Sequence, residues 1–361
     1  MSTAVASLPA TAPDSGVLDL GTLPLEGGCE LPELRLAWRS WGRLNAAGDN
    51  AVLICHALTG DAEAASWWAP LFGPGRALDP QRDFILCSNA LGGCRGSSGP
   101  TSTAPNGQAW GGRFPAISLR DQVEAQRRLA DAFGIRAIRL VLGGSMGALQ
   151  ALEWAAADVR VQAFASVAGS ARHSAWCLAW NEAQRQAIEA DPEFRGGAYA
   201  PERPPRAGLA AARAIAMATY RSAASLEQRF GRDDGAARFG ERAAAPDDFA
   251  VRNWLRHHGR ALNARFDANS YLRLLDALDS HDVGRDRGGV EAALARIRVP
   301  ALVVSIPGDQ LYVPADQYQL AEGLASAELA VLPSAHGHDG FLLDAERLEP
   351  LLRRFRQRLG Q

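Results

Sequence analysis

The stretch LVLGGSMGALQALEW, residues 140–154, joins an apolar run to a helical run through the pentapeptide Gly-Gly-Ser-Met-Gly, residues 143–147. A Gly-x-Ser-x-Gly sequence between a strand and a helix is typical of a nucleophile elbow, a sharp turn that presents its serine at the N-terminus of the helix. Glycines leave room for the turn, and backbone N–H groups of the first helical turn can hold an oxyanion. The pattern predicts that Ser145 is a nucleophile; a glycine-rich turn with a structural serine is the alternative interpretation.

Short apolar runs on both sides of this segment predict a parallel sheet covered by helices. Residues 119–134 predict a helix that ends at Gly134. Residues 33–42 alternate between apolar and polar side chains, which predicts an antiparallel edge strand. The runs that predict buried strands are residues 51–58, 83–91, 138–145, 161–169, 300–306 and 328–334.

The sequence changes in character between residues 172 and 298, where arginine and alanine dominate and stretches such as 208–231 have a helical pattern. This change predicts a helical lid, residues 172–298, inserted into a core formed by residues 16–171 and 299–361. Residues 1–15 are rich in Ala, Pro, Ser and Thr and are predicted to be a disordered tail. Together with the serine turn, these features predict an α/β-hydrolase fold with a mostly parallel sheet and an inserted helical lid.

The composition excludes several classes of function. All 38 basic side chains are arginines, so neither a Walker phosphate-binding loop nor a Schiff-base enzyme is possible. A net charge of -2 argues against nucleic-acid binding, which depends on a surplus of positive charge. The N-terminus lacks the features of a secretory signal, and no run approaches the ~18 apolar residues of a membrane span. We therefore expect a cytoplasmic protein that acts on small molecules, with neither a membrane nor a nucleic acid as partner.

A serine needs a base and an orienting acid to become a nucleophile, and in this fold they follow it in the order Asp, His. Asp309 follows one late strand in SIPGDQLYVP, and His338 follows the next in SAHGHDGFLL. The carboxyl ends of parallel strands meet at one edge of a sheet, which brings these loops together. His336 competes with His338, but the Gly-His-Asp-Gly setting favours His338. Ser145, Asp309 and His338 are therefore the predicted catalytic residues.

The oxyanion of an acyl-transfer reaction needs two backbone donors. We predict that the N–H groups of Met146, directly after the serine, and of Leu58, in the HALTGD segment after an early strand, fill this role. An ordinary strand end followed by a turn is the alternative interpretation of HALTGD.

His336 and His338 allow a different interpretation, as two metal ligands on one face of a strand. No third ligand with recognisable spacing accompanies them, so we predict that the protein has no metal site.

Several blocks of sequence, taken together and in order, resemble one family. They are HALTGD (56–61), CSNALGGCRGSSGPTS (87–102), GGSMGALQALEWA (143–155), ATYRS (218–222) with FGR (230–232), RFDANSYLRLLDALDSHDVGR (265–285) and GHDGFLLD (337–344). The chain resembles the homoserine O-acetyltransferase family, an acyltransferase branch of the α/β-hydrolase fold, from about Gly27 to the C-terminal helix. The resemblance implies a triad of Ser145, Asp309 and His338 and a two-step transfer through an acyl-serine. It also implies that no cofactor is bound, that acetyl-CoA is the acyl donor, and that the protein is a homodimer in which the lids meet.

The same resemblance implies which residues hold the amino-acid acceptor. Family residues that match Arg213 and Tyr220 help to hold it, and an arginine fork suits its carboxylate. These two positions are seven apart, on one face of a helix. Asp339 matches a residue that receives the ammonium group of the acceptor, and Thr59 matches a neighbour of the site. Without the resemblance, Arg213 would be interpreted as part of a solvated helix face. Leu311 resembles acetyl-CoA users, whereas succinyl-CoA users would carry an arginine there.

We therefore expect a ping-pong transfer of acetyl from acetyl-CoA to the hydroxyl of L-homoserine, in methionine biosynthesis. A serine O-acetyltransferase or O-succinyltransferase of the same family, in cysteine biosynthesis, and a serine esterase are the alternatives. One methylene separates homoserine from serine, a difference worth only ~1–3 kcal/mol in a pocket, so L-serine stays open as acceptor. A scaffold that binds a ligand without turnover is a further alternative, against which an intact triad argues. Ala148, Leu149, Ser98 and Gly340 depart from the residues that are common in the family.

Overall fold

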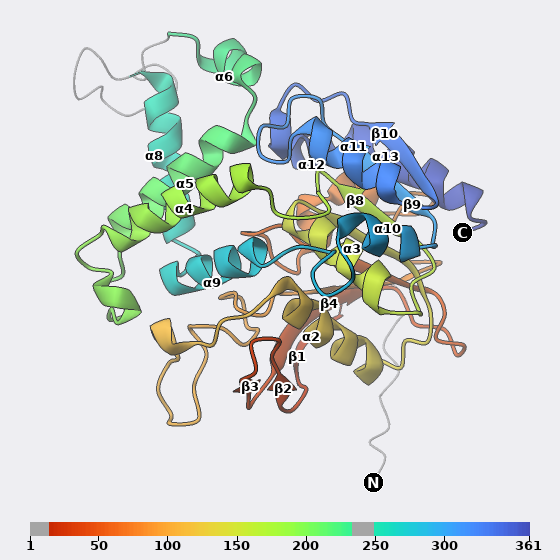
Figure 1. The fold of residues 1–361 in the computed structure, drawn as a ribbon, viewed down its shortest axis with the longest axis horizontal. Coiled ribbons are helices and arrows are strands. Elements are labelled where there is room, and N and C mark those ends of the chain that lie inside the picture. The colour runs from red at the N-terminus through yellow and green to blue at the C-terminus, as the bar shows by residue number, and fades with distance from the viewer. Residues whose placement is uncertain (1–13, 233–248) are drawn as a thin grey trace.

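The computed structural model describes residues 14–232 and 249–361, which contain an eight-stranded sheet with helices on both faces (Figure 1). The strand order is β1-β4-β6-β5-β7-β8-β9-β10. β4 is antiparallel to β1 and β6, and the other neighbours are parallel, which confirms the predicted mostly parallel sheet. The strands are β1 (Asp14–Asp19), β4 (Arg35–Trp41), β5 (Ala51–Cys55), β6 (Phe84–Ser88), β7 (Ile138–Gly144), β8 (Phe164–Val167), β9 (Ala301–Ser305) and β10 (Ala327–Val331), beside the ribbon β2 (Leu23–Pro24) and β3 (Glu30–Leu31).

The central strands are buried on both faces because their side chains alternate between two apolar clusters. In β5, Val52 belongs to the cluster that includes α13 (Ala345–Arg358). Its neighbour Leu53 belongs to the cluster that includes α2 (Leu119–Ala132) and α3 (Met146–Ala157). Burial on both faces explains why these strands have continuous apolar sequences.

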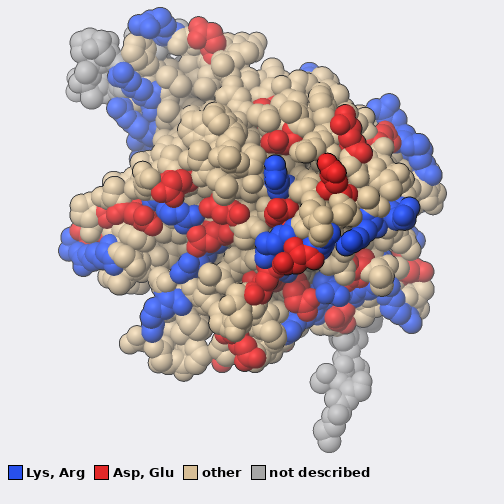
Figure 2. Space-filling view, in the orientation of Figure 1, with Lys and Arg blue, Asp and Glu red and all other residues tan. Residues whose placement is uncertain are grey.

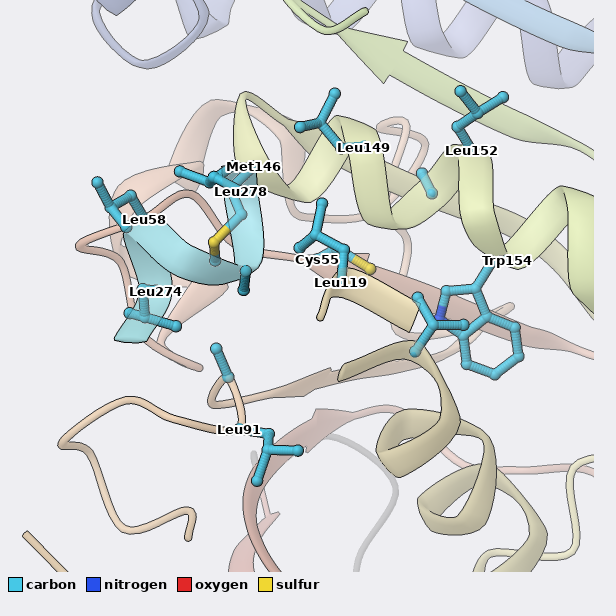
Figure 3. Close-up of a cluster of buried hydrophobic side chains, with 14 of the residues drawn as sticks. Cys55, Leu58, Leu91, Leu119, Met146, Leu149, Leu152, Trp154, Leu274 and Leu278 are labelled. Atoms are coloured by element: carbon cyan, nitrogen blue, oxygen red, sulfur yellow. The ribbon is translucent and has the colours of Figure 1, made fainter. Parts of the chain in front are cut away.

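The described residues between β8 and β9 are mainly helical. In Figure 1, α4, α5, α6 and α8 lie beside the sheet, and α5 packs against both α4 and α8. α9 contributes Leu274 and Leu278 to the same apolar cluster as Met146 of α3 (Figure 3). α10, which we expected in the lid, contacts α3 and α11 instead. The helices are α4 (Ala175–Glu189), α5 (Arg206–Tyr220), α6 (Ala223–Phe230), α8 (Ala250–Asn263), α9 (Ala268–Asp279) and α10 (Val290–Arg296), followed after β9 by α11 (Pro314–Gly323).

β1, and not β4, forms one edge of the sheet. The predicted tail lies outside the described residues except for Asp14 and Ser15, which begin β1. Because β1 pairs with β4, the prediction that β4 is an edge strand was wrong. β1 is held by backbone pairing and buries little of its surface, with Val17 53% exposed, so apolar patterning does not reveal it.

The predicted helical stretch at 208–231 divides into α5 and α6. Arg221 between them has an extended backbone, with φ -114° and ψ 142°. Ser222 then caps α6, because its side chain accepts a hydrogen bond from the N–H of Ser225. The alanine-rich sequence conceals this break, since alanine favours helix on both sides of it.

Figure 2 shows acidic and basic side chains intermixed over the visible face of the molecule. Arginine and carboxylate often pair directly, as Arg285 does with Glu26 at 2.8 Å. Within the described ranges, no helix has both the length and the apolar character needed to cross a membrane.

Candidate active site

The turn between β7 and α3 places Ser145 in a strained conformation, with φ 57° and ψ -123°. A Cβ atom on Gly143 would lie 2.0 Å from the carbonyl oxygen of Gly147. A Cβ atom on Gly147 would lie 1.9 Å from the carbonyl oxygen of Cys55 in β5. Only glycine fits at these two positions, so the pentapeptide folds as the predicted elbow.

The structure brings Ser145, Asp309 and His338 together at the carboxyl edge of the sheet. His338 Nε2 lies 2.8 Å from Ser145 Oγ, and His338 Nδ1 lies 2.7 Å from Asp309 Oδ2. Asp309 follows β9, and His338 lies in the 3-10 turn Gly337–Asp339 after β10. All three side chains are buried, so water competes little for these hydrogen bonds.

The carboxylate of Asp309 is fixed by further donors. Its Oδ1 accepts hydrogen bonds from the N–H groups of Leu311, at 2.8 Å, and Tyr312, at 3.0 Å. The side-chain amide of Gln317 in α11 donates to Oδ2 at 3.3 Å and to the carbonyl of Tyr312 at 2.6 Å. Sequence reasoning missed Gln317, because no motif marks a glutamine whose contacts depend on how α11 packs.

The environment of His338 favours its protonated form. Burial alone would lower the pKa of the imidazole, but the charge and hydrogen bond of Asp309 raise it above the ordinary value, and Asp339 acts in the same direction. The rings of Tyr220, Tyr312 and Phe341 surround the imidazole, with centroids 5.5 to 5.6 Å from it. A base with a raised pKa inside an apolar enclosure is suited to accept a proton from a serine hydroxyl.

His336 takes no part in this triad. Its Nδ1 accepts a hydrogen bond from Arg221 at 3.0 Å and lies 3.3 Å from Ser225 Oγ. Both ring nitrogens of His338 are engaged by Ser145 and Asp309, which leaves neither for a metal. Across the part of the chain that is described, no group of three or more His, Cys, Asp or Glu side chains could hold a metal ion.

The two residues predicted to form the oxyanion hole lie near the serine in the chain or in the pocket. Met146 is the first residue of α3, and Leu58 lines the same pocket as Ser145. Neither backbone N–H donates a hydrogen bond to another described residue. These amides are therefore available to an oxyanion at the serine.

A pocket with about 340 Å³ of empty space, partly open to solvent, lies over Ser145. It contains all four residues predicted to hold the acceptor. Arg213 donates to Thr59 Oγ1 at 3.5 Å, and its guanidinium carbon lies 5.5 Å from the ring centre of Tyr220. The lining residues are Ala57, Leu58, Thr59, Ser145, Arg213, Tyr220, His338, Asp339, Phe341 and Leu342.

Opposite charges meet in this pocket. Burial raises the pKa of Asp339 above its ordinary value, although His338, Arg213 and Arg221 oppose the shift. Burial also raises the pKa of Tyr220, against the influence of Arg213. A cation on the lid and a carboxylate on the core thus provide complementary groups for a zwitterion.

Arg265 is a second cation beside this pocket, and sequence reasoning gave it no individual role. Its Nη1 donates to the carbonyl of Thr59 at 2.7 Å, so Thr59 contacts both Arg265 and Arg213. The signal that could have identified it is its place at the start of the 265–285 block.

Comparisons with known proteins show which family this chain resembles. A family model described as alpha/beta hydrolase fold matches residues 50–345. A homoserine O-acetyltransferase from Trichormus variabilis is 50% identical over 338 residues, which cover 93% of this chain and 92% of that protein. The structure of a homoserine O-acetyltransferase from Staphylococcus aureus is 29% identical, with a TM-score of 0.77, and the match covers 95% of each chain. An acetylester hydrolase from Corynebacterium glutamicum is 27% identical, with a TM-score of 0.83, over 95% of this chain and 96% of that one.

Proposed function

Because the chain belongs to the homoserine O-acetyltransferase family of α/β hydrolases, we propose that it transfers acetyl from acetyl-CoA to the hydroxyl of L-homoserine through an ester on Ser145. Membership confirms the family predicted from the sequence blocks and makes the chain an acyltransferase with an acyl-CoA substrate. The product, O-acetyl-L-homoserine, belongs to methionine biosynthesis. The observation that carries the proposal is the hydrogen-bonded series Ser145, His338, Asp309 beside a pocket with both Arg213 and Asp339.

In the first half-reaction, His338 Nε2 accepts the proton of Ser145 as the serine oxygen attacks the thioester carbon. The N–H groups of Leu58 and Met146 donate to the resulting oxyanion. The carbon–sulfur bond then breaks, His338 returns the proton to the sulfur, and coenzyme A leaves as the thiol. The hydrogen bond from His338 Nδ1 to Asp309 supports this role, because it fixes the tautomer with Nε2 free to accept.

In the second half-reaction, the hydroxyl of the acceptor replaces the thiol. His338 removes the hydroxyl proton, the oxygen attacks the acyl carbon, and the bond from that carbon to Ser145 Oγ breaks. The same two N–H groups hold the second oxyanion, and His338 returns the proton to Ser145. Transfer exceeds hydrolysis only when the acceptor is held in place and water is excluded.

The pocket supports an amino acid as the acceptor. We assign the carboxylate of the acceptor to Arg213, beside Tyr220 and Thr59, and its ammonium group to Asp339. The position of Arg213 near Tyr220 supports this assignment, because the ring limits the directions in which the guanidinium can turn. L-Serine would present the same two charges one methylene closer to its hydroxyl, so it is the competing acceptor.

The donor is assigned as acetyl-CoA. Leu311 is buried next to Asp309, and its apolar side chain offers no partner for the extra carboxylate of a succinyl group. Succinyl-CoA is therefore the competing donor to be tested.

An esterase that uses water as acceptor is the second candidate function. The likeness to the acetylester hydrolase from Corynebacterium glutamicum favours it, because the same fold serves hydrolysis in that protein. The presence of both Arg213 and Asp339 in the pocket favours transfer, since water needs neither charge.

The experiment measures thiol release on a grid of acetyl-CoA and succinyl-CoA against L-homoserine, L-serine and no acceptor. We expect the fastest release with acetyl-CoA and L-homoserine. Ser145→Ala should lower this rate by about 10⁴-fold or more. Ser270→Ala is the matched control, because it removes a buried hydroxyl in the lid that has no hydrogen-bond partner among the described residues.

Each alternative predicts a different result on this grid. Faster release with L-serine would overturn the acceptor, and faster release with succinyl-CoA would overturn the donor. Equal release with and without an acceptor would favour the esterase. Unchanged release by Ser145→Ala would reject the acyl-serine mechanism as a whole.

A further inference from the structure

We propose that Arg221 and Ser222, the joint between α5 and α6, are positioning residues that tie the lid to the loop of the catalytic histidine. Through this tie, they direct the acyl group to the amino-acid acceptor and away from water. The inference rests on the acyl-serine mechanism proposed above and adds residues that do not contact the reacting atoms.

Arg221 makes the first part of this tie. Its side chain is buried, with the residue only 5% exposed. Its Nη2 donates to His336 Nδ1 at 3.0 Å and to Ser225 Oγ at 2.8 Å. His336 precedes His338 by two residues, so the guanidinium of the lid holds a side chain of the loop that leads to the catalytic imidazole.

Ser222 makes the second part. Its hydroxyl donates to the carbonyl of Ala335 at 2.6 Å and accepts from the N–H of Ser225 at 3.0 Å. One hydroxyl therefore both caps α6 and binds the histidine loop. The break between α5 and α6, which the sequence pattern did not reveal, directs the side chains of Arg221 and Ser222 toward the histidine loop.

The two catalytic loops and the lid meet in van der Waals contact at Gly337. This glycine has φ +71°, and a Cβ atom there would lie 2.6 Å from the N of Ser222 and 3.0 Å from the carbonyl oxygen of Gly308. Gly308 directly precedes Asp309. The joint thus touches the aspartate loop and the histidine loop at one point, which leaves little freedom for the lid to move without moving the triad.

The buried positive charge of Arg221 destabilises the folded protein unless its hydrogen bonds to Ser225 and His336 are kept. Burial lowers the pKa of Arg221 below the usual arginine value, and Asp339 opposes that shift. A buried guanidinium that lost its hydrogen bond to His336 would need water as a replacement partner. An apolar side chain would be enough if this position only filled space. The charged guanidinium of Arg221 therefore indicates that its hydrogen bonds fix the orientation of the histidine loop.

The joint also determines where the acceptor lies. Tyr220 is the residue before Arg221, and Arg213 lies on the same helix, so both move with the end of α5. If the joint loosens, these residues withdraw and water reaches the ester. His338 then takes a proton from water as the water oxygen adds to the acyl carbon. The bond from that carbon to Ser145 Oγ breaks, His338 gives the proton to the serine oxygen, and acetic acid leaves as acetate after it loses its own proton to solvent.

The test measures the ratio of acetate to O-acetyl-L-homoserine formed from acetyl-CoA and L-homoserine, together with total thiol. Arg221→Met should raise this ratio about tenfold and raise the KM for L-homoserine, with a smaller fall in total thiol release. Arg221→Lys should restore part of the normal ratio, because an ammonium can still donate to His336. His336→Phe should act like Arg221→Met, and the double variant should show no further change.

Arg185→Met is the matched control. Arg185 is a lid arginine that pairs with Asp276 and Asp279 inside the lid, at 2.7 and 2.9 Å, and its loss should leave the ratio unchanged. A merely structural role for Arg221 would lower the amount of active enzyme and leave the ratio at its original value. His336→Asn provides a milder change if Arg221→Met does not fold.

Two failures can be told apart. An unchanged ratio in both Arg221→Met and His336→Phe, with Ser145 essential for thiol release, would reject only the positioning role. Normal thiol release by Ser145→Ala would reject the proposed function itself. A raised ratio in Arg185→Met equal to that in Arg221→Met would also overturn the inference, because the effect would then be general to the lid.

Discussion

Ser145 shows how one residue depends on the space left by its neighbours. A non-glycine residue with positive φ costs on the order of 1–3 kcal/mol and persists only where the surrounding structure determines it. Here a side chain on Gly143 would clash with Gly147, and a side chain on Gly147 would clash with Cys55. The close packing of these backbones holds the turn in this conformation. The strain keeps the hydroxyl at the start of α3, where His338 reaches it.

The raised pKa of His338 predicts the pH dependence of acylation. The imidazole accepts a proton only when it is neutral, and its pKa lies above 6.5, so the rate of thiol release should rise with pH through a midpoint above 6.5. Asp309→Asn removes the charge that raises this pKa, and burial then lowers it. We expect the midpoint to move to lower pH while the maximal rate falls about 10⁴-fold.

The measurement is the pre-steady-state release of thiol between pH 5 and 9, a range chosen around the ordinary histidine pKa of about 6.5. Asp286→Asn is the control, because its side chain is 80% exposed and should leave the midpoint in place. A midpoint that stays fixed or rises in Asp309→Asn would contradict the assignment of Asp309 as the source of the shift.

The residues that sequence could identify are those with a local signature. Ser145 lies between glycines, and Asp309 and His338 each follow an apolar strand, so each is marked by its neighbours in the chain. Gln317 carries no such mark, and Arg221 is marked only as a member of the ATYRS block, which assigns it no role. Their contacts with Asp309 and His336 depend on how α11 packs and how α5 ends, which only the folded chain determines.

At the scale of elements, sequence patterns identified the buried strands better than the exposed ones. Burial on both faces gives β5 and β7 their apolar runs, whereas β1 pairs along an open edge with its side chains mostly in solvent. The break between α5 and α6 was missed for a related reason. Its cause, the docking of Ser222 on Ala335, is a tertiary contact that overrides the helical propensity of the segment.

The last helix, α13, depends on a buried ion pair for its attachment to the sheet. Arg356 donates to both carboxylate oxygens of Asp83, at 2.7 and 2.8 Å, and to the carbonyl of Ala77 at 2.6 Å. Arg356→Met would leave the carboxylate of Asp83 buried, with Arg139 at 3.4 Å as its remaining ion-pair partner among the described residues. We expect a loss of about 3–5 kcal/mol in the free energy of unfolding.

Urea unfolding followed by circular dichroism measures this loss as a lower midpoint. Arg354→Met is the control on the same helix, since Arg354 is exposed and donates to the carbonyl of Pro350 one turn earlier. Its effect should be about 0.5 kcal/mol or less. Equal midpoints for the two variants would show that the Asp83 pair contributes nothing particular to stability.

At the scale of the whole molecule, the use of arginine for every basic side chain is reflected in the ion pairs of the structure. Arginine forks bridge separate parts of the chain, as Arg356 does with Asp83 and Arg285 with Glu26. The arginines with proposed functional roles, Arg213 and Arg221, instead donate hydrogen bonds to Thr59, Ser225 and His336. The charge of Asp339 acts on both guanidinium groups. Arg213 also lines the pocket over Ser145, where it can donate to the carboxylate of an acceptor.

The lid also carries exposed apolar side chains. Trp176 and Leu178 of α4 are 49% and 39% exposed, and covering such side chains is a main source of association energy. We expect a homodimer whose lids meet, with twice the 38.5 kDa mass of one chain in light scattering.

Leu178→Glu should place a charge in the interface and shift the mass toward one chain. Leu343→Glu, on a 53% exposed leucine of the core helix α12 (Gly340–Leu343), is the control and should leave the dimer intact. A dimer that survives Leu178→Glu, or a single-chain mass for the unaltered protein, would contradict this arrangement of the lids.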